Sequence, residues 1–130
     1  MPVDLRPSGV SKTAALTALA AVAERWELRK TERHLLLGVP ESTANHWFSA
    51  LSRGVIDEKE VLAAPLVERI SHIVSVYDLL HRIVKGKDAD RWIERPNDAF
   101  AGQAPRELLL TGRADDLLRV RGYLERIASQ

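Results

Sequence analysis

Apolar residues recur along this chain at the three- and four-residue spacing of amphipathic helices, separated by glycine, proline and short polar runs. Ser11 is a favourable N-cap, and it predicts a helix from Lys12 to about Trp26. Gly38 and Gly54 each follow an apolar stretch, as the glycine that ends a helix does. They predict two more helices, from about Lys30 to Leu37 and from about Glu41 to Leu51.

The second half continues the helical pattern. Asp57 with Glu60 resembles a capping box, which predicts a short helical turn up to Ala64, and Pro65 begins a long helix to about Val84. Asp88 begins a short helix through Glu94, and two terminal helices follow a loop. The first of these starts near Pro105 and stops at Gly112, and the second opens with Asp115 and Asp116. Without any useful strand alternation, the pattern predicts an all-α fold.

The segment Leu28 to Trp47 has the layout of a helix-turn-helix, with Gly38 at the sharp turn and Val39 and Trp47 directed to the core. The outward positions of its second helix are candidates for reading bases, while flanking cations are candidates for phosphates. The first set is Ser42, Thr43, Asn45, His46 and Ser49, and the second is Arg29, Lys30, Arg33 and Arg53. His34 at the turn and Glu41 in the second helix leave an alternative: a helical domain kept for dimerisation, with weak or lost DNA contact.

The long helix from Pro65 carries an apolar stripe at alternating steps of three and four residues. Its members Ile70, Ile73, Tyr77, Leu80 and Val84 are candidates for dimerisation. An ordinary buried helix explains the stripe equally well. The width of the stripe favours both roles, with one side in the chain's own core and the other against a second copy.

Composition excludes several classes of protein. The 130 residues suffice for one core or two small helical subdomains, and no apolar run is long enough to span a membrane. The chain has no cysteine and no signal-peptide layout, which indicates a cytoplasmic protein without disulfides or thiolate chemistry. His72 and His81 fall on opposite sides of one helix, and Asp115 and Asp116 diverge on another. We therefore expect no metal, no cofactor and no enzymatic activity.

Charge adds one weak indication. The net charge is +1, with a small excess of basic residues in residues 1–54 and a small acidic excess in residues 55–130. This distribution is weak support for nucleic-acid contact by the first half.

Many positions of the last third occur in the order found in one known family. They are Trp92, Arg95-Pro96-Asn97, Phe100, Gly102, Pro105, Glu107-Leu108-Leu109, Gly112-Arg113, Asp116-Leu117-Leu118, Val120 and Tyr123-Leu124. This string resembles the toxin-binding domain of the bacterial Xre/MbcA/ParS antitoxins, and the helix-turn-helix resembles their DNA-binding half. Two prolines, one glycine and few apolar residues predict a flexible arm over residues 1–10. The resemblance implies two further parts: a helix-turn-helix DNA-binding domain over 11–56, and a helical dimerisation and toxin-binding domain over 57–130.

The resemblance also implies partners. Antitoxins of this family pair with RES-domain toxins, which destroy NAD, and their terminal segment lies across the mouth of the toxin's NAD pocket. The implied toxin-binding residues are Trp92, Arg95, Pro96, Asn97, Phe100, Arg113, Arg119, Arg121, Tyr123, Arg126, Ile127 and Gln130, with Arg126 and the tail after it as the blocking group. We expect an antitoxin that is also a homodimeric repressor of its own operon at an inverted-repeat operator. The alternative is a helix-turn-helix regulator with a partner- or ligand-sensing domain.

Overall fold

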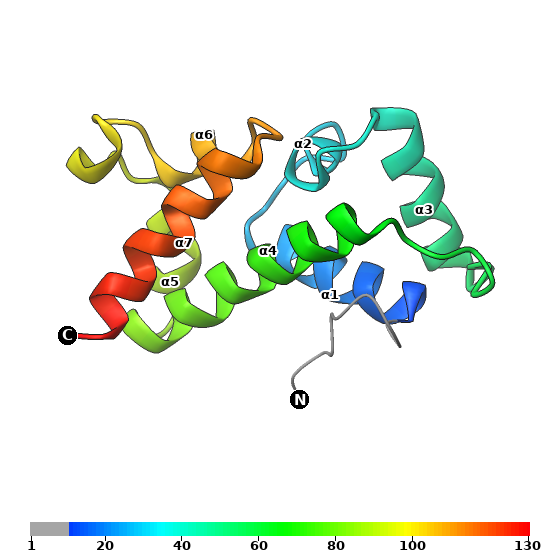
Figure 1. The fold of residues 1–130 in the computed structure, drawn as a ribbon, viewed down its shortest axis with the longest axis horizontal. Coiled ribbons are helices and arrows are strands. Elements are labelled where there is room, and N and C mark those ends of the chain that lie inside the picture. The colour runs from blue at the N-terminus through cyan, green and yellow to red at the C-terminus, as the bar shows by residue number, and fades with distance from the viewer. Residues whose placement is uncertain (1–10) are drawn as a thin grey trace.

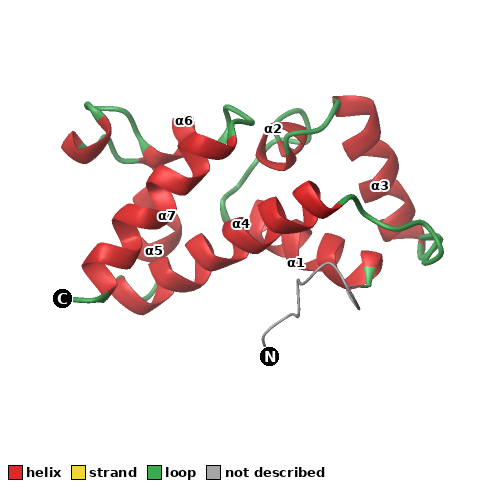
Figure 2. Cartoon of the chain, in the orientation of Figure 1, coloured by secondary structure: helices red, strands yellow, loops and turns green. Residues whose placement is uncertain are grey.

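The computed structural model describes residues 11–130, and this range forms seven α-helices, two short 3-10 helices and no strand (Figures 1 and 2). The all-α fold class is therefore confirmed, while the predicted arm over residues 1–10 lies outside the described range. The α-helices are α1 (Lys12–Arg25), α2 (Arg33–Leu37), α3 (Glu41–Arg53), α4 (Ala64–Ile83), α5 (Asp88–Arg91), α6 (Pro105–Leu109) and α7 (Ala114–Ala128). The 3-10 helices span Trp92–Glu94 and Asp98–Phe100. None of the helices in residues 11–130 is long and apolar enough to cross a membrane.

Local chemistry sets most helix ends. Ser11 caps α1, because its hydroxyl oxygen accepts the N–H of Ala14 at 3.2 Å. Gly38 and Gly54 end α2 and α3 in the left-handed conformation, with φ of 71° and 69°. At the start of α6, the Glu107 carboxylate accepts the N–H of Ala104 at 2.9 Å. These four ends follow the sequence prediction.

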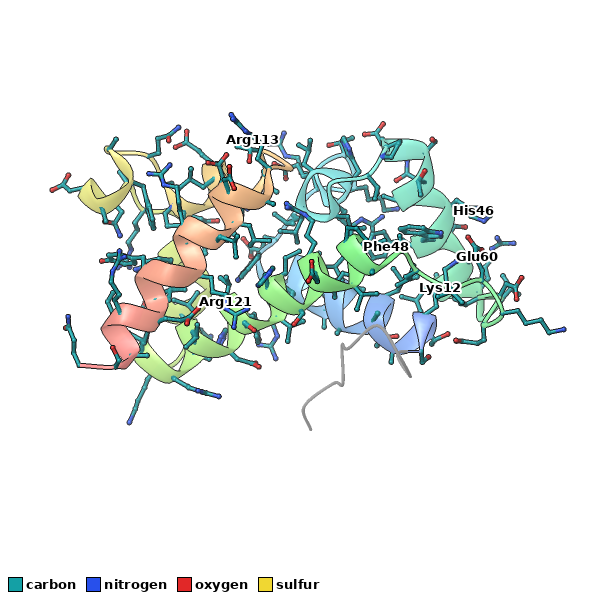
Figure 3. The ribbon with its side chains drawn as sticks, viewed as in Figure 1. Lys12, His46, Phe48, Glu60, Arg113 and Arg121 are labelled. Carbon is teal, nitrogen blue, oxygen red and sulfur yellow. The ribbon has the colours of Figure 1, made fainter. Side chains whose placement is uncertain are left out.

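The capping box predicted for Asp57 and Glu60 was wrong. Residues 57–63 form turns and extended chain without a helix, and the Asp57 carboxylate accepts the N–H of Lys59. Glu60 instead pairs with Lys12, whose Nζ lies 2.8 Å from the Glu60 carboxylate while the Lys12 side chain is only 4% exposed (Figure 3). A buried ammonium needs an anionic partner, and that need outweighs the local cap. Two smaller differences are that α2 begins at Arg33 and that the helix after Asp88 tightens to 3-10 geometry at Trp92.

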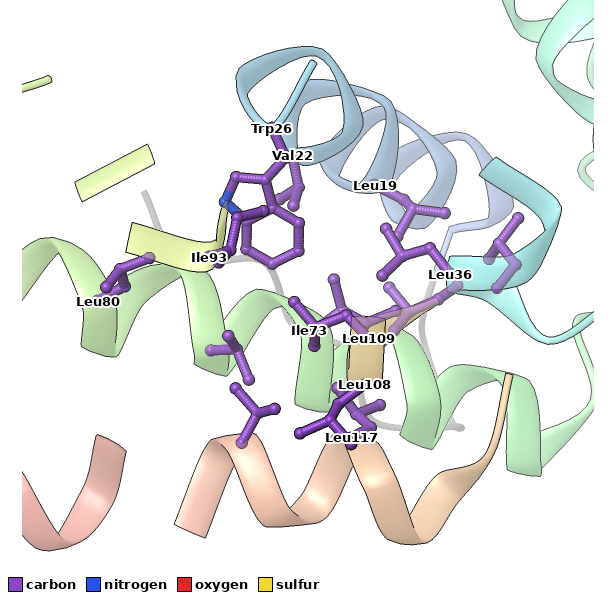
Figure 4. Packing of buried hydrophobic residues seen from close by; sticks show 14 of the residues in the cluster. Leu19, Val22, Trp26, Leu36, Ile73, Leu80, Ile93, Leu108, Leu109 and Leu117 are labelled. Atoms are coloured by element: carbon purple, nitrogen blue, oxygen red, sulfur yellow. The ribbon is translucent and has the colours of Figure 1, made fainter. Parts of the chain in front are cut away.

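One apolar core holds the described chain together. The long helix α4 extends from α1–α3 on one side of the molecule to α5–α7 on the other, and it contacts helices of both groups (Figure 1). Buried side chains from α1, α2, α4, α6 and α7 meet in a single cluster, with Ile93 between α5 and α6 joining them (Figure 4). Examples are Trp26, Leu36, Ile73, Leu109 and Leu117. The first and second halves of the chain are thus packed on each other.

Burial within the single chain corrects three of the five residues predicted for dimerisation. Ile70, Ile73 and Leu80 have no exposed surface in the single chain, and Tyr77 and Val84 are half-buried against the same core. The reason is that α1 packs on one side of α4 and α7 on the other. Ile70, Ile73 and Leu80 therefore have no surface left for a second copy, whereas Tyr77 and Val84 keep part of their surface exposed.

Candidate functional site

Three aromatic side chains from separate segments gather beside α7, and we call them the aromatic cluster. The rings of Trp92 and Tyr123 stack with centroids 6.1 Å apart and planes 17° apart, and Phe100 meets Tyr123 edge-on at 5.2 Å. Phe100 is buried, whereas Trp92 and Tyr123 keep part of their surface exposed. Such stacked and edge-to-face pairs are favourable arrangements of aromatic rings. The cluster fixes three predicted toxin-binding residues in one place.

The loop before α6 is organised by Asn97. Its side-chain oxygen accepts the N–H of Ala99 at 2.9 Å, and its backbone carbonyl accepts the N–H groups of Phe100 and Gly102. These hydrogen bonds hold the 3-10 helix Asp98–Phe100, which directs the Phe100 side chain into the core. Arg95 and Pro96 lie exposed just before this loop. Asn97 therefore acts on the site by shaping the backbone.

One flank of α7 carries two of the cationic candidates, Arg119 and Arg126. The Arg119 guanidinium lies 5.9 Å from the Phe100 ring centre and 3.8 Å from the Asp116 carboxylate, with half of its side chain exposed. Arg126 is two helical turns further along the same flank, exposed, with Ile127 half-buried and Gln130 exposed beyond it. Cations on an aromatic platform form a surface suited to an acidic or anionic partner.

Arg121 and Arg113 lie apart from this flank (Figure 3). Arg121 faces α4, where its Nη1 donates to His72 Nδ1 at 2.6 Å and its Nε pairs with Glu125 at 2.9 Å. Burial and the neighbouring Arg121 lower the pKa of His72, so that its ring is held neutral as an acceptor. Arg113 is exposed at the turn before α7. The four predicted toxin-binding arginines from Arg113 onwards are therefore divided between two faces of α7 and the turn before it.

The exposed face of α3 presents the residues predicted to read DNA. Ser42, Asn45, His46, Ser49 and Arg53 are all exposed, and Arg29 and Lys30 are exposed ahead of α2. Thr43 is half-buried at the side of the helix, about 100° around the axis from Ser42, so it lies at the edge of this face. A hollow of about 530 Å³ gathers five of the predicted residues with Glu41: Lys30, Arg33, Asn45, Ser49 and Arg53.

Arg33 is held in this hollow by an aromatic ring. Its guanidinium lies 4.2 Å from the centre of the Phe48 ring, and burial lowers the pKa of Arg33 without any nearby carboxylate among the causes. Phe48, only 6% exposed, and Ala44 pack α3 on the core, whereas Trp47 lies half-buried at the edge under the Lys12 ammonium. Trp47 packs against the core from its edge, as the sequence predicted, and the buried aromatic position on α3 belongs to Phe48.

His34 fits the turn despite its size. Its Nδ1 lies 3.1 Å from the carbonyl oxygen of Val39, across the Gly38 turn, and its Nε2 lies 3.8 Å from the Glu41 carboxylate. The ring thus joins the end of α2 to the start of α3. His34 therefore has a structural role at this turn, although the sequence pattern indicated a departure from the helix-turn-helix motif.

Sequence reasoning missed two arginines that join the halves of the chain. Arg69 of α4 is 9% exposed and donates to carbonyl groups at the end of α2, and Arg106 of α6 reaches the segment between α1 and α2. Burial lowers the pKa of Arg69. An arginine inside an apolar stretch of α4, between Val67 and Ile70, is the one sequence signal that could have marked Arg69.

An apolar groove of about 610 Å³ opens where the two halves meet. Its walls come from the end of α2, the segment before α4, the first turns of α4 and the start of α7. Val61 and Leu118, which line it, are 82% and 45% exposed.

Comparison with known proteins gives two findings. Residues 79–129 match the family described as antitoxin Xre/MbcA/ParS C-terminal toxin-binding domain. The chain is also 39% identical, over 114 residues, to a protein of Sinorhizobium fredii (strain NBRC 101917 / NGR234) that bears the name "Uncharacterized protein y4oB". That alignment covers 86% of this chain and 82% of the relative. The family match includes α5, α6, α7 and the whole aromatic cluster.

Proposed function

Because the chain belongs to the family that carries the Xre/MbcA/ParS antitoxin C-terminal toxin-binding domain, we propose that it neutralises a RES-domain toxin that degrades NAD. It has a toxin-binding domain, and a cognate toxin is its partner. The finer proposal is that it is the antitoxin of a type II toxin–antitoxin system, acts in the cytoplasm, and covers the active site of the toxin.

The observation that carries this proposal is the aromatic cluster with Arg119 above it. Interfaces draw most of their binding energy from aromatic and arginine side chains that are rigid before binding. Stacking of Trp92 on Tyr123 and packing of Arg119 on Phe100 supply that rigidity here. The flank is contiguous with Arg126 and the tail, which are the candidates to enter the mouth of the toxin's pocket.

The test is charge reversal at one exposed arginine. We expect Arg126→Glu to abolish protection in cells that co-express the toxin, and to weaken binding of the purified toxin at least tenfold. Arg25→Glu is the matched control, because Arg25 is also exposed in the last turn of a helix but lies on α1, outside the matched residues 79–129. Deleting residues 127–130 should act like Arg126→Glu, since Leu124 and the core remain. Full protection by both altered proteins, shown to be folded, would refute blocking by the tail.

For the other half of the chain, we propose operator binding and autorepression through α3. The support is an exposed face with Asn45, Ser42 and Ser49, flanked by the cations of the adjoining hollow. Such motifs bind inverted repeats as two-fold dimers, so we also propose a homodimer. Its contacts would have to lie outside Ile70, Ile73 and Leu80. If the chain does not retard the upstream promoter region in a gel-shift assay, either alone or with the toxin, this part of the proposal is refuted.

A second candidate function is favoured by the apolar groove. Its volume of about 610 Å³ falls within the usual range of small-molecule sites, roughly 300–1,000 Å³, which fits a helix-turn-helix regulator that senses a ligand. Co-purification with a toxin would decide for the antitoxin. A small molecule retained by the purified chain, together with no toxin binding, would decide for the regulator.

A further inference from the structure

The wall of the apolar groove contains one charged side chain that is almost fully buried. Arg69 of α4 lines the groove and is only 9% exposed. Burial lowers the pKa of its guanidinium, and no carboxylate is among the causes of that shift. Within residues 11–130, none of the ion pairs includes this arginine. Arg69 is therefore a buried cation without an anionic partner in the described part of the chain.

Two carbonyl groups hold the Arg69 guanidinium in place without neutralising it. Its Nε donates to the carbonyl oxygen of Leu36 at 2.6 Å, and its Nη2 lies 3.5 Å from that of Leu35. A guanidinium carries five N–H donors in one rigid plane, so these two contacts leave donors available for another acceptor. A buried charge is costly until it is paired. A carboxylate is the partner that fits, because it accepts two parallel hydrogen bonds from a guanidinium.

The rest of the groove suits an apolar molecule. Val61 and Leu118 line it and are 82% and 45% exposed, and the half-buried Leu66 and Trp47 add further apolar surface. Covering such surface is favourable, and a volume of about 610 Å³ accepts a hydrocarbon chain or an aromatic ring. One cation within an apolar groove is complementary to a molecule that has one carboxylate and an apolar body.

Three other titratable side chains line the groove, and none of them places a competing charge in its interior. Glu60 is paired with Lys12 at 2.8 Å. Glu68 is exposed, so that water and salt screen its charge. His72 has a lowered pKa and accepts a hydrogen bond from Arg121 as a neutral ring.

We propose that the groove binds a small apolar carboxylate, such as a medium-chain fatty acid, with the carboxylate on Arg69 and the apolar body against Val61 and Leu118. This site gives a ligand class to the second candidate function, on which its regulatory meaning rests. Binding itself can be tested on the purified full chain without toxin or DNA.

The first test is titration calorimetry with three probes: octanoate, 1-octanol and acetate. Octanoate should bind with one molecule per chain, and 1-octanol, which has the same apolar body without the charge, should bind at least about tenfold more weakly. Acetate keeps the charge but lacks the apolar body, so it should not bind measurably. Equal affinities for octanoate and 1-octanol, or no binding of octanoate, overturn the proposal.

The second test locates octanoate on the chain by comparing Val61→Asp with Val55→Asp. Both valines are exposed outside the helices, but Val55, at 58% exposure, does not line the groove. We expect Val61→Asp to weaken octanoate binding at least about tenfold, because it removes apolar contact and adds a like charge. Val55→Asp should bind as wild type does. Equal affinities of the two variants place octanoate elsewhere and overturn the proposal.

The third test addresses the anchor. Arg69→Gln should bind octanoate no better than 1-octanol. If this variant does not fold, because the Leu36 carbonyl loses its donor, the wild-type chain decides by nuclear magnetic resonance. The Nε–H signal of Arg69 should shift on addition of octanoate and stay in place on addition of 1-octanol. A signal that octanoate does not move refutes the anchor.

These outcomes are distinct from those of the toxin-binding tests. If the toxin binds and octanoate does not, the groove site and the ligand-sensing regulator fail, and the antitoxin proposal stands. If octanoate binds as expected and the toxin does not, the antitoxin proposal fails and the groove site stands.

Discussion

Arg106 and Glu32, 74 positions apart in the chain, form an ion pair with 2.8 Å between Nη2 and Oε1. Arg106 also donates to the carbonyl oxygen of Trp26 at 3.0 Å, and Glu32 accepts the N–H of Arg29 at 2.8 Å. The N–H of Arg29, followed by the charge of Arg106, holds the pKa of Glu32 below its ordinary range. The pair thereby fastens α6 to the segment between α1 and α2.

Replacing Arg106 with Gln should lower the free energy of unfolding by about 1–3 kcal/mol, since two part-buried acceptors lose a charged donor. Urea unfolding measures the difference. The control is Glu125→Gln, which breaks a more exposed i,i+4 pair with Arg121 and should cost under about 0.5 kcal/mol. Equal losses in the two variants would contradict a fastening role for Arg106.

Stability should fall as the pH drops below the ordinary range of histidine, and His72 should contribute to that fall. Its folded-state pKa is lowered, so the folded chain binds the proton less readily than the unfolded chain does. The contribution of His72 is therefore complete above its ordinary pKa and is lost as the pH falls through the lowered one. Thermal unfolding at pH 7.5 and 5.5 measures it. In His72→Gln, whose amide oxygen can still accept from Arg121, the drop should be smaller; an unchanged drop would count against this origin.

Replacing Arg119 with Met should separate binding from folding. The Met side chain keeps apolar contact with Phe100, and an exposed cation–π contact contributes only about 0.5–1 kcal/mol, so the free energy of unfolding should change little. Toxin affinity should fall at least tenfold, as measured by calorimetry. Arg25→Met, on α1 and outside the matched residues 79–129, should leave both quantities unchanged. Equal toxin affinities of the two variants would remove Arg119 from the interface.

Two substitutions on α3 should differ in their effects on DNA binding. Asn45→Ala should relax base preference at one position and cost about 1–3 kcal/mol on the preferred sequence. Arg53→Ala should weaken all sequences alike and reduce the salt slope by about one. Fluorescence anisotropy at several salt concentrations measures both effects, with Arg25→Ala on α1 as an exposed control. Identical behaviour of the three variants would argue against α3 as the reading helix.

The purified chain should have a mass of about twice 14.5 kDa by light scattering at micromolar concentration. Leu80→Ala should leave that mass unchanged while lowering the free energy of unfolding by about 2–5 kcal/mol, because Leu80 belongs to the chain's own core. A mass of 14.5 kDa at every concentration would refute the dimer.

The sequence correctly predicted those helix ends that are set by residues close by in the chain. Ser11, Gly38 and Gly54 act within a few residues of themselves, and α1 and α3 accordingly lie close to their predicted bounds. The turn at residues 57–63 could not be predicted this way, because Glu60 is drawn to Lys12 by a charge buried far away in sequence. Local propensity decides an element only where no distant partner competes for the same side chain.

Periodicity had a similar limit at α4 and α7. A stripe such as Ile70, Ile73 and Leu80 shows which side of a helix is buried, but it does not show whether the cover is the same chain or a second one. The residue order from Trp92 to Tyr123 led to the aromatic cluster, yet it gave no sign that Arg121 turns towards His72. Arg69 and Arg106 act through carbonyl groups of other segments, which carry no side-chain signature.

The shared core also has a consequence for the degradation of this protein by proteases. Trp26 and Leu36 pack in the same cluster as Ile93 and Leu117, so a protease that opens either end of the described chain removes the support of the other. Under the proposed function, toxin binding and operator binding therefore have a single lifetime. Proteolysis would free the toxin and derepress the operon at the same moment, and new synthesis would begin when protection lapses.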